Sequence, residues 1–477
     1  MTDLYSGGMT DLFFPRALVE GAWVRDARVA TTAEGYISAV EVGAAAPDAE
    51  RVAGIAVPGV PNLHSHAFQR AMAGLTERGS PAGDSFWSWR ERMYAFVQRL
   101  EPPDIEAIAA QLYVELLRHG YTSVAEFHYL RNAADGRAYQ DPVEMARRVL
   151  AAADVAGMGV TLLPVLYRTS DFGGAPPTPA QRRFVVSVED LVGDILVLAA
   201  AAEDENTRVG MALHSLRAVP ATELAIAVDT IQGLDPHAPI HVHVAEQVRE
   251  VDACVAWSGA RPVEWLLANA PVDARWCLIH ATHVDQHEVD ALAGCGAVAG
   301  LCPTTEANLG DGVFPLVEYQ AAGGRWGVGS DSHVSVSPVA ELRTLEYAQR
   351  LTRLERNVAA GGQRRSTGRT LLEAAWSGGS AACGRALGQL APGARADIVV
   401  LDPNHPALAG REGDDVLDSW IFSGEDTPVA HVMVGGRWVV RDGRHVRQDA
   451  VAAAYRQVAR GLAGAVPHLS VEAGGGG

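Results

Sequence analysis

The chain has 477 residues, is 48% hydrophobic, and carries a formal net charge of −18 at pH 7. Binding of nucleic acid needs clustered positive charge, so we expect this acidic chain to bind no nucleic acid. No run approaches the roughly 20 apolar residues that span a bilayer, and the N-terminus lacks the basic and apolar segments of a secretory signal. We therefore expect no membrane association and a cytoplasmic location.

All 39 basic residues are arginines, because the sequence contains no lysine. The chain therefore cannot form a lysine Schiff base, a P-loop lysine contact, or a carboxylated-lysine bridge between two metal ions. Its five cysteines are odd in number and never spaced as Cys-x-x-Cys. This pattern argues against a disulfide framework or a thiolate zinc site, so we expect buried, reduced thiols.

The N-terminal part contains short β-like segments, such as residues 22–24 and 36–40, with turn residues between them. Met-Thr-Asp-Leu occurs twice, at residues 1–4 and 9–12, which indicates an extension or alternative start without an assigned function. We predict that residues 1–57 form the first part of a small β domain.

From residue 58 onward, short apolar runs alternate with amphipathic helical stretches. The runs end near His64, Phe127, Leu166, Leu213, Val244, Ile279, Leu301 and Gly329. Helices are expected at 104–119, 142–156, 188–202, 221–231, 247–257 and 286–292. Eight strands alternating with helices are what a (β/α)8 barrel requires, with its active site at the carboxyl ends of the strands. A doubly wound open sheet is the alternative, but the strand count favours an α/β TIM-like barrel over residues 58–385.

The sequence after the barrel returns to a β pattern. Residues 396–402 read as a strand, and residues 431–440 as a hairpin with a Gly-Gly turn. We predict that residues 386–450 complete the N-terminal β domain, which makes a small β-sandwich built from both chain ends. A terminal segment, residues 451–477, is expected to hold a helix at 451–462 and a flexible tail at 474–477.

Polar residues at the predicted strand ends are candidates for chemistry. Residues two apart in a strand point to the same side, so His64 and His66 can present two imidazoles to one point in space. Taken alone, such a pair is more often hydrogen-bonded than ligating. Further candidates stand at strands five, six and eight: His243, His280 and Asp331. Spacing alone does not exclude His241 and His283 from these roles.

His-x-His on strand one, histidines on strands five and six, and aspartate on strand eight resemble the motif of the amidohydrolase superfamily. The resemblance covers nearly the whole chain, and it implies that the metal ligands are His64, His66, His243 and Asp331. Two-metal members generally bridge their ions with a carboxylated lysine, which this chain lacks. We therefore expect one divalent metal ion, with zinc as the expected element.

The segment His243-Val244-Ala245-Glu246 resembles the His-x-x-Glu of the deaminating branch of that superfamily, which also favours His243 over His241. By this resemblance Glu246 moves a proton to the nitrogen of a C=N bond, while His280 and Asp331 orient and deprotonate the attacking water. An imine carbon is a poor electrophile until its nitrogen is protonated, and water needs a metal to become a good nucleophile. The structural alternative for Glu246 is a carboxylate favoured by a helix N-terminus.

Substrate contacts are expected from residues near the same strand ends. Gln69 follows the histidine pair, an aromatic loop at 86–90 precedes a helix, and Tyr129 follows strand two. Two arginines near one pocket suggest a small anionic substrate, because guanidinium binds carboxylates bidentately. These segments resemble members of the superfamily that deaminate a linear amidine carrying two carboxylates. The residues that would bind this substrate are Gln69, Arg90, Tyr129, His214 and Arg217.

Three other interpretations stay open at this point. A deaminase of an aromatic ring, such as a nucleobase, shares the metal and Glu246 but needs no arginine pair. An amide or ring hydrolase of the superfamily does not need the His-x-x-Glu arrangement. A metal-binding protein without catalysis has no use for Glu246 and His280, so their presence counts against it. A homodimer is expected.

Overall fold

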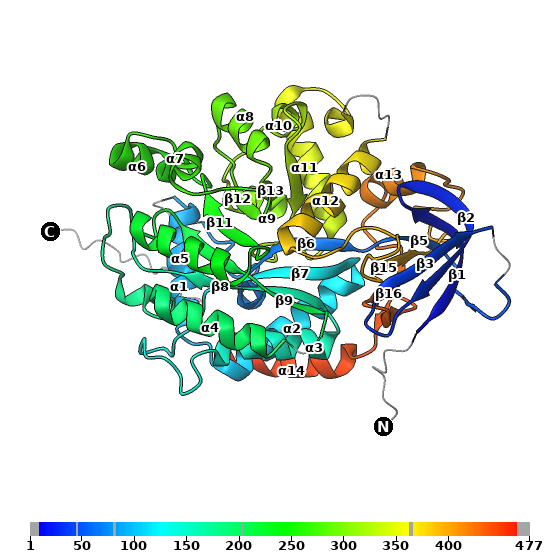
Figure 1. Ribbon diagram of the computed structural model, residues 1–477, viewed down its shortest axis with the longest axis horizontal. Coiled ribbons are helices and arrows are strands. Elements are labelled where there is room, and N and C mark those ends of the chain that lie inside the picture. Colours follow the sequence, from blue (N-terminus) through cyan, green and yellow to red (C-terminus); the bar gives the residue numbers. More distant parts are fainter. Residues whose placement is uncertain (1–8, 44–45, 80–82, 203, 362–365, 465–477) are drawn as a thin grey trace.

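The computed structural model describes residues 9–43, 46–79, 83–202, 204–361 and 366–464. The first Met-Thr-Asp-Leu copy and the expected flexible tail at 474–477 lie outside these residues. In Figure 1 the barrel occupies the left and centre of the molecule, and a smaller β domain lies on the right.

Eight parallel strands form the barrel, and they coincide with the eight runs expected from the sequence. They are β6 (Val60–Ser65), β7 (Tyr121–His128), β8 (Gly159–Leu166), β10 (Met211–Ser215), β11 (Ile240–Val244), β12 (Trp276–His280), β13 (Val298–Leu301) and β14 (Arg325–Val328). A short strand, β9 (Thr207–Val209), also pairs with β8. The first and last strand ends meet, because the backbone N–H groups of Ser330 and Asp331 donate to the His64 carbonyl at 3.1 and 3.0 Å. The barrel prediction is confirmed.

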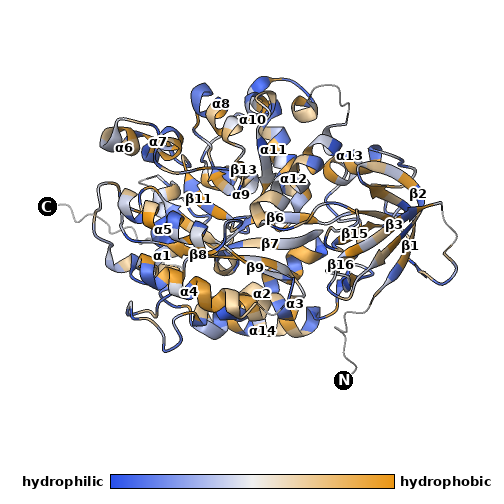
Figure 2. Cartoon of the chain, in the orientation of Figure 1, coloured by the Kyte–Doolittle hydropathy of each residue, from blue (hydrophilic) through white to orange (hydrophobic). Residues whose placement is uncertain are grey.

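The six helices expected between the strands are present. They are α2 (Pro102–Arg118), α3 (Glu144–Ala156), α4 (Val188–Ala200), α5 (Ala221–Leu234), α6 (Val248–Ser258) and α8 (Gln286–Cys295). Hydrophobic and hydrophilic residues alternate around these outer helices (Figure 2), as the amphipathic pattern requires. Five more helices of the barrel were not predicted: α7 (Pro262–Asn269), α9 (Pro303–Leu309), α10 (Leu316–Ala321), α11 (Pro338–Arg353) and α12 (Thr367–Cys383). The helix expected after residue 90 is α1 (Phe86–Val97).

Helix α12 illustrates why some helices escaped prediction. It contains Gly378 and Gly379, which lower helix propensity. Their missing side chains allow close packing on the barrel: a Cβ at Gly378 would lie 1.9 Å from the Trp326 carbonyl oxygen, and one at Gly379 would lie 2.7 Å from Pro61 Cβ. The prediction of an aromatic loop at 86–90 is wrong, because these residues form the first turns of α1.

Both chain ends contribute to the second sheet, as predicted. Its strands are β1 (Asp11–Val19), β2 (Ala22–Thr31), β3 (Ile37–Val42), β4 (Glu50–Arg51), β5 (Ile55–Pro58), β15 (Ile398–Leu401), β16 (Val429–Val434), β17 (Arg437–Arg441) and β18 (Arg444–His445). They form one hydrogen-bonded sheet in which N-terminal β5 pairs antiparallel with C-terminal β15. Side chains from both ends, including Phe14, Val29, Ile398 and Met433, share a separate buried core.

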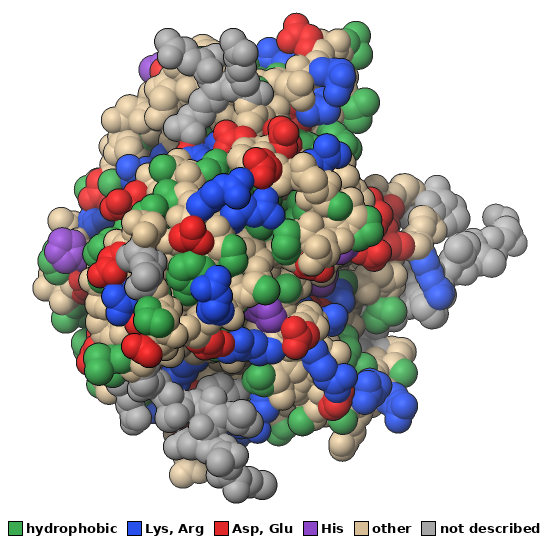
Figure 3. All heavy atoms as spheres, turned by 90° about the vertical axis from the view of Figure 1, so that its right-hand side faces the viewer, with side chains coloured by type: hydrophobic (Ala, Val, Ile, Leu, Met, Phe, Trp, Pro, Cys, Tyr) green, Lys and Arg blue, Asp and Glu red, His purple; other side chains and the backbone are tan. Residues whose placement is uncertain are grey.

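Two details of this domain bear on the sequence predictions. The hairpin between β16 and β17 turns at Gly435 and Gly436, whose φ angles of 52° and 76° suit glycine. Strand β1 begins at Asp11, so the end of the second Met-Thr-Asp-Leu copy belongs to the sheet and is no extension. On the face that this domain presents, acidic and basic side chains are interspersed (Figure 3).

The remaining helices tie the C-terminal segment to the barrel. Helix α13 (Asp415–Phe422) packs against α11 and α12, and α14 (Gln448–Gly461), predicted as the final helix, packs against α2. Short 3-10 helices occur at Ala67–Met72, Pro179–Gln181 and Val358–Ala360. The predicted domain boundaries stay predictions: the one at 57/58 falls inside β5, just before its last residue, and the one at 385/386 falls after α12. Every helix in the described ranges is too short or too polar to cross a bilayer.

Candidate active site

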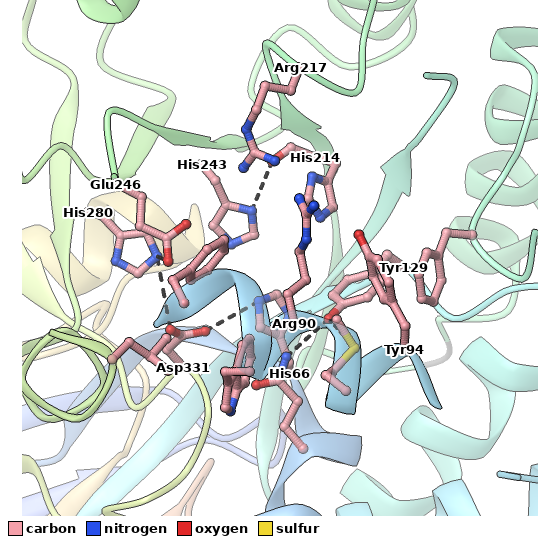
Figure 4. Close-up of a pocket in the computed structure, with 16 residues that line it drawn as sticks. His66, Arg90, Tyr94, Tyr129, His214, Arg217, His243, Glu246, His280 and Asp331 are labelled. Atoms are coloured by element: carbon pink, nitrogen blue, oxygen red, sulfur yellow. Dashed lines mark hydrogen bonds and ion pairs between the residues drawn. The ribbon is translucent and has the colours of Figure 1, made fainter. Parts of the chain in front are cut away.

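A pocket lies at the carboxyl ends of the barrel strands, and about 530 Å³ within it and at its open mouth is not filled by protein atoms. Its walls include every site residue expected from the sequence except His64, which is fully buried. The lining residues are His66, Gln69, Phe86, Trp89, Arg90, Met93, Tyr94, Tyr129, Phe184, His214, Arg217, His243, Glu246, His280, Leu309 and Asp331. The close-up in Figure 4 shows how ten of them face one another.

Three histidines and one aspartate converge at the inner end of this pocket. The Nε2 atoms of His64 and His66 each lie 3.3 Å from Asp331 Oδ1, and His243 Nε2 lies 3.0 Å from His64 Nε2. The four expected ligands, which come from the ends of β6, β11 and β14, are therefore brought together.

In His66 and His243, the ring nitrogen that points away from the cluster, Nδ1, is hydrogen-bonded, which leaves a lone pair on Nε2 inside the cluster. His66 Nδ1 lies 2.9 Å from the Phe127 carbonyl, and His243 Nδ1 lies 2.9 Å from the His214 carbonyl. A carbonyl oxygen only accepts, so both Nδ1 atoms carry the hydrogen and both Nε2 atoms carry a lone pair. Burial lowers the pKa of all three histidines, and for His64 and His243 the neighbouring imidazoles lower it further. Neutral imidazoles and a carboxylate oxygen at this spacing fit a divalent metal ion.

The strand ends are bent so that their side chains reach the pocket. His280 and Asp331 have φ angles of 69° and 44°, a left-handed conformation that is uncommon outside glycine. Such backbone geometry concentrates at functional sites, where the surrounding structure maintains it. Here it directs the imidazole and the carboxylate toward the histidine cluster.

Glu246 and His280 form a buried acid–base pair beside the cluster. His280 Nε2 lies 3.7 Å from Glu246 Oε1 and 4.0 Å from Asp331 Oδ2, and Figure 4 shows the carboxylate of Glu246 next to this ring. Burial raises the pKa of Glu246 to about 7. Burial lowers the pKa of His280, but Glu246, Glu306 and Asp331 outweigh it and raise that pKa to about 10. The site thus holds a carboxyl group able to take up and release a proton near neutral pH.

The two competing histidines are occupied elsewhere. His241 Nε2 lies 2.8 Å from the Ala382 carbonyl on α12, so this ring faces that helix. His283 Nε2 lies 2.8 Å from the Asp311 carbonyl. The structure therefore places His243, and neither of its competitors, in the cluster.

The expected substrate residues line the outer part of the pocket. Gln69 Nε2 donates to the Tyr129 hydroxyl at 3.0 Å, and the Oε1 atom of Gln69 is buried without a partner. The Nε atoms of Arg90 and Arg217 are likewise buried and unbonded. Within the described residues, neither arginine forms an ion pair, although Arg217 is only 7% exposed. A pocket with two guanidinium groups that are outside any ion pair of the described residues suits a ligand with carboxylates.

The sequence did not reveal several residues of the site. Glu306 Oε1 lies 3.2 Å from His280 Nδ1 and also accepts the Cys302 backbone N–H, and Asp311 lies close to Glu246 and His280. Both carboxylates follow strand seven, which carries none of the expected motif. Met93, Tyr94, Phe184 and Leu309 also line the pocket and were not predicted. None of these four residues belongs to a segment that carries the sequence motif.

Comparisons with known proteins agree with this geometry. A family model described as the amidohydrolase family matches residues 55–439. The formimidoylglutamate deiminase of Pseudomonas aeruginosa is 52% identical over 454 residues, which covers 94% of this chain and 99% of the relative.

Solved structures of similar fold are also known. The amidohydrolase from Brucella melitensis superposes with a TM-score of 0.90 at 48% identity, covering 95% of this chain and all of that chain. An adenosine deaminase from Xanthomonas campestris with bound zinc superposes with a TM-score of 0.76 at 20% identity, covering 95% and 98%. The second likeness shows the fold alone.

Proposed function

The chain belongs to the amidohydrolase family, and on that premise we propose that it hydrolyses N-formimidoyl-L-glutamate to N-formyl-L-glutamate and ammonia. This reaction is a step of histidine degradation. The observation that carries the proposal is the pairing of one histidine–aspartate cluster and Glu246 with two arginines, Arg90 and Arg217, whose buried Nε atoms have no hydrogen-bond partner, in a single pocket. The 52% identical deiminase supports the same substrate. The homodimer and the cytoplasmic location stay predictions.

We assign the metal site to His64, His66, His243 and Asp331, with one zinc ion as the expected occupant. The free imidazole lone pairs and the Asp331 carboxylate supply the donors that zinc prefers. A divalent ion bound there would lower the pKa of a water molecule and so supply the nucleophile. His280 and Asp331 line the same end of the pocket, where they would orient that water and take part in its deprotonation.

The proton chemistry is assigned to Glu246. Water adds to the amidine carbon, and the proton released from it passes through the carboxyl group of Glu246 to the terminal imino nitrogen. The hydroxyl proton of the resulting tetrahedral species then passes to the same nitrogen as its C–N bond breaks, so ammonia leaves and the carbon becomes the formyl group. A carboxyl pKa of about 7 suits both uptake and release of this proton.

The arginines fix which nitrogen faces Glu246. If Arg90 and Arg217 bind the two carboxylates, the substituted nitrogen stays with the glutamate skeleton at the outer end of the pocket. The terminal nitrogen is then free to lie beside Glu246. Gln69, Tyr129 and His214, which share this wall, supply further polar contacts.

The alternative within the family is deamination of a nucleobase or another aromatic amidine. Such a ring carries no carboxylates, so it would leave the guanidinium groups of buried Arg217 and half-buried Arg90 without an anionic partner. A panel assay for ammonia release separates the two readings. We expect release from N-formimidoyl-L-glutamate and little from guanine, cytosine or adenosine; the reverse ranking would overturn the proposal.

We expect Arg217→Met and Arg90→Met to raise KM for N-formimidoyl-L-glutamate by roughly 10- to 100-fold, the range for a lost hydrogen bond to a charged group. Metal content should not change, because neither side chain belongs to the histidine cluster. Arg456→Met, on α14, removes the same charge outside the pocket and serves as the control. Wild-type kinetics in either pocket variant would mean that this arginine does not bind the substrate.

A further inference from the structure

Three arginines lie around one indole, that of Trp87, and two of them, Arg90 and Arg217, line the pocket. The guanidinium carbons of Arg90, Arg217 and Arg249 lie 4.6, 5.7 and 4.4 Å from the centre of the Trp87 ring. All three distances fall within the roughly 6 Å over which a cation is attracted to an aromatic face. Trp87 lies in the first turn of α1, and Arg249 lies in the first turn of α6, so the cluster joins the two helices.

The three arginines differ in exposure. Arg249 is exposed, Arg90 is half-buried, and Arg217 is buried. Among the described residues, none of the three has a carboxylate within ion-pair distance, whereas arginines on outer helices, such as Arg148 and Arg369, pair with acidic neighbours. Unpaired positive charge therefore continues from the protein surface to the substrate arginines.

We propose that Arg249 is a further substrate-recognition residue, which admits the dicarboxylate substrate at the mouth of the pocket, and that Trp87 positions the arginine set. The inference rests on the proposed function and names residues that serve the same site.

The negative net charge of the protein explains why positive charge near the pocket is useful. A chain with a net charge of −18 repels the two carboxylates of the substrate, and local positive charge offsets this. Like-charged guanidinium groups also repel one another when no anion is bound. The electron-rich face of Trp87 reduces that cost and holds the groups near one another until the carboxylates arrive.

The test compares Arg249→Gln with Arg456→Gln, which removes the same charge from α14. For Arg249→Gln, we expect kcat/KM for N-formimidoyl-L-glutamate to fall roughly 3- to 10-fold at about 10 mM ionic strength, with kcat nearly unchanged. The deficit should shrink at about 0.5 M salt, where charges are screened within a few ångströms. If Arg249→Gln matches Arg456→Gln at both salt concentrations, Arg249 has no role in recognition.

Variants of Trp87 test the positioning role. Trp87→Leu should raise KM several-fold with little change in kcat, and Trp87→Phe should restore most of the loss because it keeps an aromatic face. Equal defects in both variants, or a fall in kcat alone, would refute positioning through the ring.

A binding measurement keeps this inference separate from the proposed function. If the wild-type protein releases no ammonia from N-formimidoyl-L-glutamate, the proposed function fails. In that case, calorimetric titration with glutarate, a dicarboxylate, still measures whether Arg249 contributes to carboxylate binding. Weaker, salt-dependent binding in Arg249→Gln supports the inference, and binding equal to that of Arg456→Gln overturns it.

Discussion

Glu246→Gln should lower the turnover of N-formimidoyl-L-glutamate by roughly 10²- to 10⁴-fold, the usual effect of losing a general acid or base. Glutamine keeps the size and polarity of the side chain but cannot carry a proton between water and the imino nitrogen. The carboxylate lies 3.7 Å from His280 and is no member of the histidine cluster, so bound metal should remain. Steady-state kinetics together with elemental analysis measure both quantities.

Glu106→Gln provides the matched control for this variant. Glu106 pairs with Arg148 at 2.9 Å on the outer surface of the barrel, so the same substitution there should leave turnover unchanged. Turnover within about threefold of wild type in Glu246→Gln would remove Glu246 from the proton path.

The second large effect is a loss of bound metal, which we expect when His243 is replaced but not when His241, also on β11, is replaced. His243→Asn should abolish metal binding and reduce turnover more than Glu246→Gln does, because both the nucleophile and its orientation depend on the ion. His241→Asn should keep the metal, because His241 contacts the Ala382 carbonyl and lies outside the cluster.

Elemental analysis after exhaustive dialysis checks this pair. Wild type and His241→Asn should contain close to one divalent ion per chain, and His243→Asn close to none. A ratio near two in the wild type would contradict the single-ion site, and full metal content in His243→Asn would remove this histidine from the ligand set.

The strand ends of the barrel could be predicted because they carry their own signal. Each buried strand reads as a short apolar run, and polar residues such as His64, His243 and Asp331 stand where the runs stop. Parallel strands bring their carboxyl ends to one rim, so residues far apart in sequence were expected to meet. The distances of 3.0 to 3.3 Å within the cluster agree with that expectation.

Other parts depended on packing that a sequence does not display. The glycines of α12 lower its helix propensity, and only the close contacts of Gly378 with Trp326 and of Gly379 with Pro61 explain that pair. Glu306 reaches His280 because a short helix follows strand seven, and nothing in the sequence pairs the two residues. Likewise, the arginines around Trp87 come from separate segments, and only the folded chain brings them to one ring.

NMR analysis of the reaction products tests the central claim most directly. Attack of water on the amidine carbon gives a tetrahedral species with two nitrogens, and either of them can leave. If the arginines hold the glutamate skeleton and Glu246 protonates the terminal nitrogen, the products are N-formyl-L-glutamate and ammonia. Formamide and free glutamate as the main products would contradict the account.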